Sequence, residues 1–373
     1  MDAYFGQYFG SFLHDRPYAS LIFSTSGTVR FFSGRVWFRE HLYDVDQVMI
    51  AGAEVQRPSQ DKPVPSGLRT RTSRAASLYG VEALQRLWRS TVTVVGVGGT
   101  GSAAAHVLAR AGVGRVVLID TEVLEPSNIE RLHGSEAAHL ADPPTKVDII
   151  RDMCRRVNPD IEVVAIDGNC LQPLAIDWMS RSDLVLGCTD TMHSRVGLSE
   201  LAYRYLVPVI DIGVQLDGSG GAVTAQCIQF VVYQPGLPCA YCRNLVDTWR
   251  LTAELMPESE REARRGQARE ARDHDRVGEM YWRELPQLLT VGHLTTTAGA
   301  MGAGYAIGLL TATSRMPATF FQVDLLSDGL GYVAVEVERR PECACAEIVG
   351  YGDLGNARAA IAAPAHWREA RIR

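Results

Sequence analysis

A glycine-rich turn between an apolar run and an alanine-rich segment constrains the fold of this chain more than any other feature. Residues 91–95 are β-branched and apolar without alternation, which is typical of a strand covered on both faces. Residues 96–101 follow with the spacing Gly-x-Gly-x-x-Gly and open a helical segment, and residues 115–120 form a second apolar run. This order predicts a strand–helix–strand unit with parallel strands and a right-handed crossover.

The alternation of apolar runs and helical periodicity continues through the middle of the chain. Further strands and helices are expected, in chain order, at 146–157 (helix), 161–166, 183–188, 194–205 (helix) and 207–211. Residues 222–232 alternate less cleanly and indicate that an antiparallel portion begins there. The expected fold class is α/β: a Rossmann-like, mostly parallel sheet with helices on both faces, continuing into an antiparallel portion.

Three regions are expected along the chain. Residues 1–70 form a small N-terminal α+β unit and a linker with several prolines, and residues 71–350 form the main domain. Residues 351–373 form an alanine-rich C-terminal tail. Within the main domain, a charged crossover insertion lies around 243–290.

Two local patterns refine this division. In the N-terminal unit, Ser26-Gly27 predicts a hairpin turn, and Ser33-Gly34 predicts a second one. In the insertion, residues 258–279 are dense in Glu, Arg and Asp, and opposite charges at helical spacing predict a solvated helix.

Composition gives no support for some classes of partner. Lys and Arg number 37 against 43 Asp and Glu, so the net charge of −6 gives no whole-chain support for binding nucleic acid or an anionic membrane. The longest apolar stretch, residues 298–310, is shorter than the roughly 20 residues that a membrane-spanning helix needs. No basic segment followed by an apolar run marks a signal peptide, so we expect a cytoplasmic protein.

Polar residues beyond the predicted strands suit a nucleotide site. Glycines at 96, 98, 99 and 101 let backbone N–H groups approach phosphate, and Asp120 ends the second strand, where a carboxylate can accept ribose hydroxyls. The loop alone fits either NAD or ATP. Asn128, Arg131, Lys146 and Asp190 favour ATP, because cations offset phosphate charge and a carboxylate can hold Mg²⁺.

These separated elements, taken in order, resemble the ubiquitin-activating-enzyme superfamily over about residues 71–346. The resemblance rests on the run 94–102, Asp120, the segment 127–131, Lys146 and the segment 188–190. Bacterial ThiF/MoeB-like members of the superfamily adenylate sulfur carriers, other ubiquitin-like proteins or short peptides. The resemblance therefore implies an ATP-dependent adenylyltransferase, usually a homodimer, over residues 71–350.

The resemblance also implies roles for individual residues. Asp120 would bind ribose, Asn128, Arg131 and Lys146 would contact phosphates, and Asp190 would bind Mg²⁺. Upstream, 71–74 resembles the Arg-x-x-Arg segment of the family, so Arg74 would reach the ATP of the partner subunit. Ala75 and Leu132 stand where the family usually has glutamine.

Two cysteine pairs suit a metal site. Cys239 and Cys242 form a Cys-x-x-Cys knuckle, and Cys343 and Cys345 form a Cys-x-Cys pair about 100 residues later. Four thiolates from two short turns suit a tetrahedral structural zinc ion. The family binds zinc through two Cys-x-x-Cys pairs, so the second pair of this chain differs from the family pattern by one residue in spacing.

No cysteine lies from 243 to 342, where many ubiquitin-activating enzymes carry the cysteine that forms a thioester. The chain either stops at the adenylate, uses another cysteine, or hands the acyl group directly to a partner. The histidines, including His193, show no metal-ligand spacing and receive no role.

The function expected from these residues and this resemblance is adenylation of the C-terminal carboxylate of a ubiquitin-like β-grasp protein ending in glycine. Such a step would activate the protein for a conjugation or sulfur-carrier pathway, with a conjugating enzyme as a further partner. Adenylation of a short peptide, or action on tRNA, are alternatives within the superfamily. A dinucleotide-dependent oxidoreductase and an inactive scaffold are alternatives from other classes.

Overall fold

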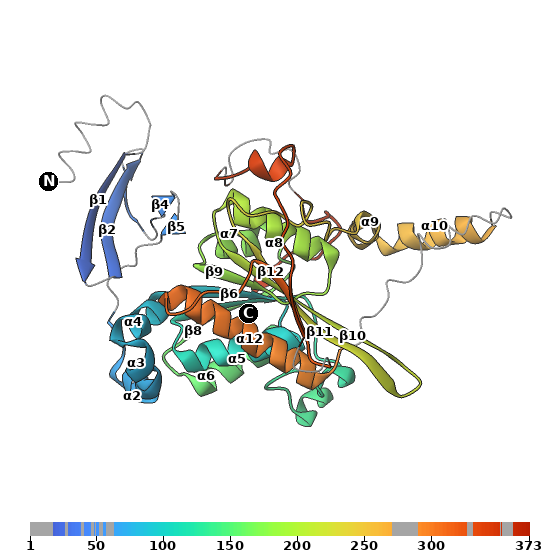
Figure 1. Cartoon of the computed structure of the whole chain (residues 1–373), viewed down its shortest axis with the longest axis horizontal. Coiled ribbons are helices and arrows are strands. Elements are labelled where there is room, and N and C mark those ends of the chain that lie inside the picture. Colours follow the sequence, from blue (N-terminus) through green and yellow to red (C-terminus); the bar gives the residue numbers. More distant parts are fainter. Residues whose placement is uncertain are drawn as a thin grey trace.

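The computed structural model describes most of the chain. The described residues are 18–26, 29–38, 41–45, 48, 50–51, 55–56, 63–270, 290–326, 331–350, 352 and 361–373. Their centre is one nine-stranded sheet with the strand order β13-β12-β11-β10-β9-β6-β7-β8-β14 (Figure 1).

The five strands at the middle of this sheet are parallel. They are β6 (Thr91–Val95), β7 (Arg115–Asp120), β8 (Glu162–Asp167), β9 (Leu184–Gly187) and β10 (Val209–Ser219). Four more strands pair antiparallel at the two edges: β11 (Ala222–Tyr233), β12 (Phe320–Asp324), β13 (Gly331–Ala334) and β14 (Arg371–Ile372). The predicted fold class is therefore confirmed, including the antiparallel continuation.

Helices cover both faces of the sheet (Figure 1). On one face lie α5 (Gly99–Ala111), α6 (Lys146–Val157) and α12 (Gly292–Thr311); on the other lie α7 (Pro173–Ser180) and α8 (Met192–Arg204). The central strands are buried on both sides, so Val94 packs with the first helix layer and Val95 with the second. This explains why β6 is apolar without alternation.

Further elements surround this core. Before the sheet lie α2 (Ser66–Arg71), α3 (Ser73–Tyr79) and α4 (Val81–Arg89); after β11 lie α9 (Thr248–Leu255) and α10 (Glu258–Glu270). Single 3-10 turns occur at η1 (Pro126–Asn128), η2 (Ala137–Ala141) and η3 (Ala344–Ala346). In the part of the chain that the structure describes, no helix has the length and apolarity needed to cross a bilayer.

The N-terminal strands form separate small sheets. They are β1 (Tyr18–Ser26), β2 (Val29–Phe38) and β3 (His41–Asp44) in one sheet, and β4 (Ile50–Ala51) and β5 (Val55–Gln56) in another. The first expected hairpin is present, but the turn expected at Ser33-Gly34 is wrong. These residues stay inside β2, where Ser33 pairs with Ile22 and Gly34 with Leu21. Gly34 serves here to leave space, because a Cβ on it would lie 2.3 Å from Leu21 Cδ2.

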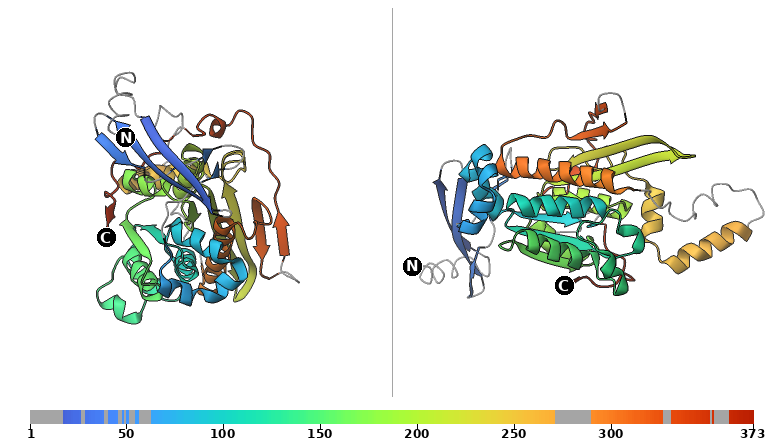
Figure 2. Two further views of the ribbon diagram at one scale, coloured as in Figure 1. Left: turned by 90° about the vertical axis from the view of Figure 1, so that its left-hand side faces the viewer. Right: turned by 90° about the horizontal axis from the view of Figure 1, so that it is seen from below.

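One helix of the charged insertion, α10, extends away from the main sheet. Helix α10 projects at the end of the molecule opposite the N-terminal sheet (Figures 1 and 2). Arg264 pairs with Glu260 one turn away, as the charge pattern predicts. The rest of the predicted solvated helix, residues 271–279, lies outside the described residues.

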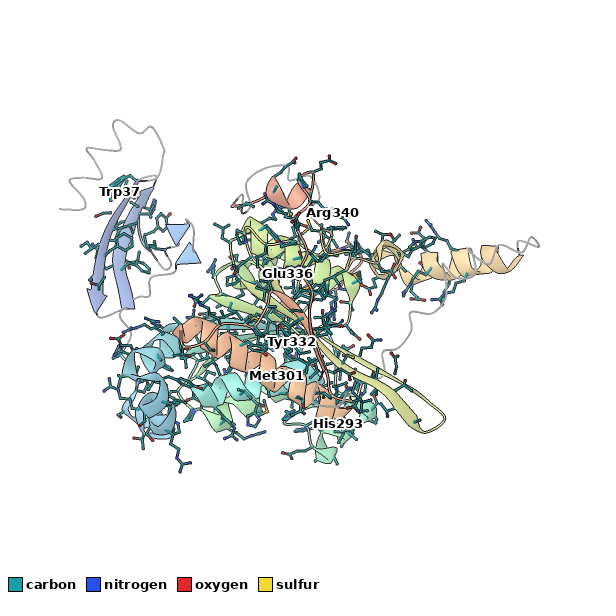
Figure 3. The ribbon with its side chains drawn as sticks, viewed as in Figure 1. Trp37, His293, Met301, Tyr332, Glu336 and Arg340 are labelled. Carbon is teal, nitrogen blue, oxygen red and sulfur yellow. The ribbon has the colours of Figure 1, made fainter. Side chains whose placement is uncertain are left out.

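Helix α12 is the closest neighbour of the helix that follows the glycine loop. It carries no charged side chain, and Figure 3 shows Met301 along it, at the rim of the core. Gly299 lies so near α5 that a Cβ on it would be 2.2 Å from Thr100 O. Since Thr100 belongs to the first turn of α5, this packing fixes the helix that begins at the loop.

Replacing Gly299 by alanine should therefore push the two helices apart. We expect a loss of about 1–3 kcal/mol in the free energy of unfolding, measured by urea denaturation. Gly304→Ala is the matched control, because the added methyl group meets nothing within 4 Å. That variant should gain up to about 1 kcal/mol from helix propensity. Equal effects of the two substitutions would contradict the close packing.

Candidate functional site

A pocket of about 570 Å³ lies where the parallel strands end. Eight of the residues singled out in the sequence line it: Gly96, Gly98, Gly99, Asp120, Asn128, Arg131, Lys146 and Asp190. They come from the ends of β6, β7 and β9, from η1 and from the start of α6. The carboxyl edge of a parallel sheet is where open α/β folds bind ligands.

The glycine loop is shaped by close backbone contacts. Gly96 has φ of +79°, a left-handed conformation that favours glycine, and a Cβ on it would lie 2.7 Å from Cys188 O. Gly101 lies under the loop rather than in the pocket, and a Cβ there would be 1.9 Å from Gly96 O. These contacts hold the first turn of α5 at the pocket, so that its free N–H groups and its dipole favour an anion.

Asp120 fixes the loop from the neighbouring strand. Its carboxylate accepts hydrogen bonds from the N–H groups of Val97 and Glu122, both at 2.8 Å. Burial raises the pKa of Asp120 to about 6, against the opposing charge of Lys146. The carboxylate is therefore ionised at neutral pH and keeps lone pairs for hydroxyl donors.

Lys146 brings a buried cation to the same place. Its side chain is only 7% exposed, and its ammonium group pairs with the carboxylate of Glu122, which is 65% exposed. A buried charge needs a partner, whereas an exposed carboxylate can move into water. Phosphate oxygens can therefore replace Glu122 as the partner of Lys146.

Asn128 and Arg131 come from the turn after β7. Asn128 is buried, and its Oδ1 accepts a hydrogen bond from the N–H of Glu125 at 3.1 Å, which leaves its amide N–H groups for a ligand. The guanidinium of Arg131 has a long contact of 3.4 Å to Ser127 O. A side chain held this weakly can turn toward an anion in the pocket.

Asp190 follows β9, which lies on the other side of β6 from β7 and Asp120. Its side chain is exposed in the pocket, and the guanidinium of Arg250 on α9 donates to its backbone oxygen. A carboxylate with free oxygens beside a phosphate-binding loop fits a hard divalent cation such as Mg²⁺.

Arg74, predicted to contact ATP, does not lie at this pocket. It is exposed on α3 and does not line the pocket of its own chain. An exposed arginine there is available to a second subunit, as the sequence resemblance implies.

Sequence reasoning missed two groups that the pocket contains. Arg195 lines it and donates to Asp211 Oδ2 and to Thr189 O, both at 3.3 Å, and burial raises the pKa of Asp211. Arg195 lies in the first turn of α8, five residues after Asp190, and that closeness in sequence was the only signal.

His193 belongs to the second group. Its Nδ1 lies 2.9 Å from Glu254 Oε2, and the same carboxylate accepts the N–H groups of Met192 and His193 at the start of α8. Burial would raise the pKa of Glu254, but these hydrogen bonds and one from Arg250 outweigh it and lower the pKa to about 2. Glu254 thus ties α9 to the wall of the pocket, and no local pattern signals a pair 61 residues apart.

The two cysteine pairs come together on the α8 face of the sheet. The sulfur atoms of Cys239, Cys242, Cys343 and Cys345 all lie within 4.8 Å of one another. Cys239 Sγ lies 3.6 Å from Cys242 Sγ and 3.5 Å from Cys343 Sγ, and Cys242 Sγ lies 3.9 Å from Cys345 Sγ. A tetrahedron with Zn–S bonds of about 2.3 Å has edges of about 3.8 Å, so the four thiols fit a zinc ion.

The other cysteines are poor nucleophiles. Burial raises the pKa of Cys154 to about 12 and that of Cys170 to about 11. Burial and the nearby Asp211 also raise the pKa of Cys188, and burial raises that of Cys227. Since the thiolate is the reactive form, a raised pKa disfavours each of these four thiols as a nucleophile.

The ThiF family model matches residues 71–345, most of the chain, and the chain therefore belongs to the ThiF family. The resemblance to ubiquitin-activating enzymes drawn from the glycine loop and its charged residues is confirmed at the family level.

Two bacterial proteins show sequence similarity to this chain over part of this region. The molybdopterin-synthase adenylyltransferase of Escherichia coli strain K12 is 34% identical over 164 residues, which cover 44% of this chain and 61% of that protein. The tRNA threonylcarbamoyladenosine dehydratase of Bacillus subtilis strain 168 is 32% identical over 139 residues, 37% of this chain and 54% of that protein. The match thus spans less than two thirds of either relative.

A solved structure extends the likeness of fold beyond the family region. The structure of E. coli MccB with MccA-N7isoASN covers 87% of this chain and 97% of that chain, with a TM-score of 0.58 and 17% identity. At this identity the comparison establishes a shared fold.

If the four-cysteine cluster holds zinc, the purified protein should contain about one zinc ion per chain by plasma mass spectrometry. Cys345→Ser should lower that content severalfold, because it removes one of four ligands. Cys154→Ser is the control, since Cys154 lies in the other core layer. A structural metal would be ruled out by two results together: no metal in the purified wild-type chain, and an unfolding midpoint that does not change when a chelator is added.

Proposed function

We propose that this chain uses ATP to adenylate the C-terminal carboxylate of a ubiquitin-like protein and releases pyrophosphate. The observation that carries the proposal is the convergence of Arg131, Lys146 and Asp190 on one pocket beside the glycine loop. The naming of relatives as adenylyltransferases supports the same reaction. A hydride-transfer site needs no such group of cations.

The chemistry assigned to the pocket is a displacement at phosphorus. The N–H groups of the loop and the start of α5 would bind the phosphates, and Asp120 would accept the ribose hydroxyls. A carboxylate oxygen of the substrate attacks the α-phosphorus, the bond from that phosphorus to the α–β bridging oxygen breaks, and pyrophosphate leaves. No proton is transferred, so positioning and charge neutralisation provide the catalysis.

The cations would act at different points of this reaction. Lys146 is the buried one, and releasing Glu122 would let it bind phosphate oxygens. Arg131 is held by one long contact and would follow the charge that develops on the leaving pyrophosphate. Mg²⁺ bound through Asp190 would offset the negative charge of the triphosphate and hold the triphosphate in position for attack.

The acyl adenylate is proposed as the product of this chain itself. The cysteines outside the four-sulfur cluster are Cys154, Cys170, Cys188 and Cys227, and burial raises the pKa of each thiol. A partner would then take the acyl group directly from the adenylate.

Adenylation of a short peptide is a second candidate, favoured by the N-terminal sheet. Strand β1 exposes Leu21, Ile22 and Phe23, with Ile22 68% exposed, on a sheet that lies outside the family match. The MccB structure, which was solved with MccA-N7isoASN, has a fold like that of this chain over 87% of its length. Such an apolar sheet could bind an extended peptide.

The substrate is tested by ATP–pyrophosphate exchange with labelled pyrophosphate. Exchange should require a β-grasp protein with a free C-terminal glycine, and a short peptide should not replace it. Asp190→Ala and Arg131→Ala should each lower the exchange rate by about 100- to 1,000-fold. Arg264→Ala, in an exposed ion pair of α10, should stay within twofold of wild type. Full exchange in Asp190→Ala would overturn the assigned role of that carboxylate, and exchange driven by the peptide would favour the second candidate.

A homodimer with Arg74 acting across subunits gives a separate expectation. Arg74→Ala and Asp190→Ala should each be inactive alone, because each removes a group from every site. Mixed and reassociated at equal concentrations, they should recover about a quarter of wild-type exchange, since half of the dimers then hold one complete site of two. No recovery, with mixed dimers verified by mass spectrometry, would exclude action across the interface.

A further inference from the structure

Residues 361–373, here termed the return segment, lie beyond the region matched by the family model, which ends at residue 345. They come back to the main sheet and end in β14, the strand next to β8. The pairing is antiparallel, with Arg371 opposite Asp167 and Ile372 opposite Ile166. The return segment therefore covers the edge of the parallel part of the sheet.

The return segment neutralises a buried carboxylate. The side chain of Asp167 is 1% exposed, and its Oδ2 accepts from Arg368 Nη1 at 2.9 Å and from Arg371 Nε at 3.1 Å. Burial would raise the pKa of Asp167, but the two guanidinium groups outweigh burial and keep the pKa below its ordinary value. Without them a buried negative charge would be unpaired.

This carboxylate lies directly beside the pocket. Asp167 is the register partner of Asp120 across β7 and β8, and the next three residues, 168–170, line the pocket. The N–H of Gly168 donates to Asp120 O at 3.0 Å. Any shift of Asp167 would thus move both Asp120 and the 168–170 loop.

Two contacts bind the return segment to the 168–170 loop itself. Ala370 lies against Gly168 so closely that a Cβ on Gly168 would be 2.3 Å from Ala370 Cβ. Gln172 donates to Arg368 O at 2.6 Å and accepts the N–H of Asn169 at 2.7 Å. The first two residues of the loop are therefore held, directly or through Gln172, by the return segment.

Trp367 adds a third contact through the histidine of the pocket wall. The rings of Trp367 and His193 have centroids 5.0 Å apart, and His193 Nε2 lies 2.9 Å from Asn169 Nδ2. His193 in turn binds Glu254 of α9. The return segment and the charged insertion thus support one wall from two sides.

We propose that the return segment is a positioning element for nucleotide binding, in which Arg368, Arg371 and Trp367 hold the 168–170 loop against the nucleoside part of the nucleotide. The loop carries no charge and adjoins Asp120, while Arg131 and Lys146 carry the positive charge of the pocket. An uncharged surface beside a carboxylate suits a base and a ribose rather than phosphates. The inference rests on the proposed use of ATP and adds residues outside the family match to its binding site.

The test compares full-length variants by isothermal titration with ATP and Mg²⁺. Arg368→Ala/Arg371→Ala should weaken ATP binding at least tenfold and raise the KM for ATP in the exchange assay by the same factor, with kcat changed less than threefold. Arg373→Ala is the matched control, because Arg373 belongs to the same segment but pairs with Asp148 on α6. Its ATP affinity should stay within twofold of wild type.

A second variant separates charge pairing from a general loss of structure. Asp167→Asn removes the buried charge, so in that background the double arginine substitution should weaken ATP binding less than threefold. Amide hydrogen exchange at residues 168–172 should rise in the double arginine variant and not in Arg373→Ala. Unchanged ATP affinity in the double variant, or an equal loss in the Asp167→Asn background, would overturn the proposal.

The outcome also separates this inference from the proposed function. Normal ATP binding without exchange in the presence of a β-grasp protein would reject that protein as the substrate. The role of the return segment would then be decided by the ATP affinities of the variants. A wild-type chain that binds no ATP would reject both.

Discussion

The hydrogen bond from the Val97 N–H to the Asp120 carboxylate ties the glycine loop after β6 to the end of β7. Backbone contacts supply the rest of the support for the loop, since its glycines offer no side chains. Because β6, β7 and β9 are parallel neighbours, the groups that follow each strand share one edge of the sheet. The position of every charged residue in the pocket therefore depends on how these three strand ends are connected.

Long-range contacts then give that edge its rigidity. Glu254 from the charged insertion caps the start of α8, and Arg368 from the return segment pairs with Asp167 at the end of β8. The four-sulfur cluster joins the segment just before the insertion to residues 343–345, which follow β13. Glu254 and Asp167 are buried carboxylates, and each would lose hydrogen-bond partners without these contacts. The pocket wall and these remote segments therefore stabilise one another.

The central part of the fold and most of the pocket follow from local sequence patterns. The β-branched run at 91–95, the glycine spacing and the helix beginning at Lys146 are each set by residues close in sequence, and their placement at one sheet edge follows from parallel topology. Asp120 and Asp190 could be named because each lies at or near the end of a predicted strand, and Lys146 because it begins a helix.

The remaining parts depend on pairs that no local pattern records. Arg195 with Asp211, His193 with Glu254 and Arg368 with Asp167 join residues 16 to 201 positions apart. Strand β14 has only two residues, too few for any periodicity, and one of them, Arg371, pairs with Asp167. The turn expected at Ser33-Gly34 shows the converse: a turn-forming dipeptide stays extended when register pairing on β1 holds it there.

The separation of about 200 positions between Asp167 and Arg368 has a consequence for how the protein is made. Parallel strands β6 to β9 can associate as soon as they leave the ribosome, but the edge of β8 stays uncovered until the distant arginines have been synthesised. Contacts between remote segments also form slowly during refolding, because a long loop must close first. Nucleotide affinity should therefore appear in the newborn chain only after the core around β6 to β9 has become compact.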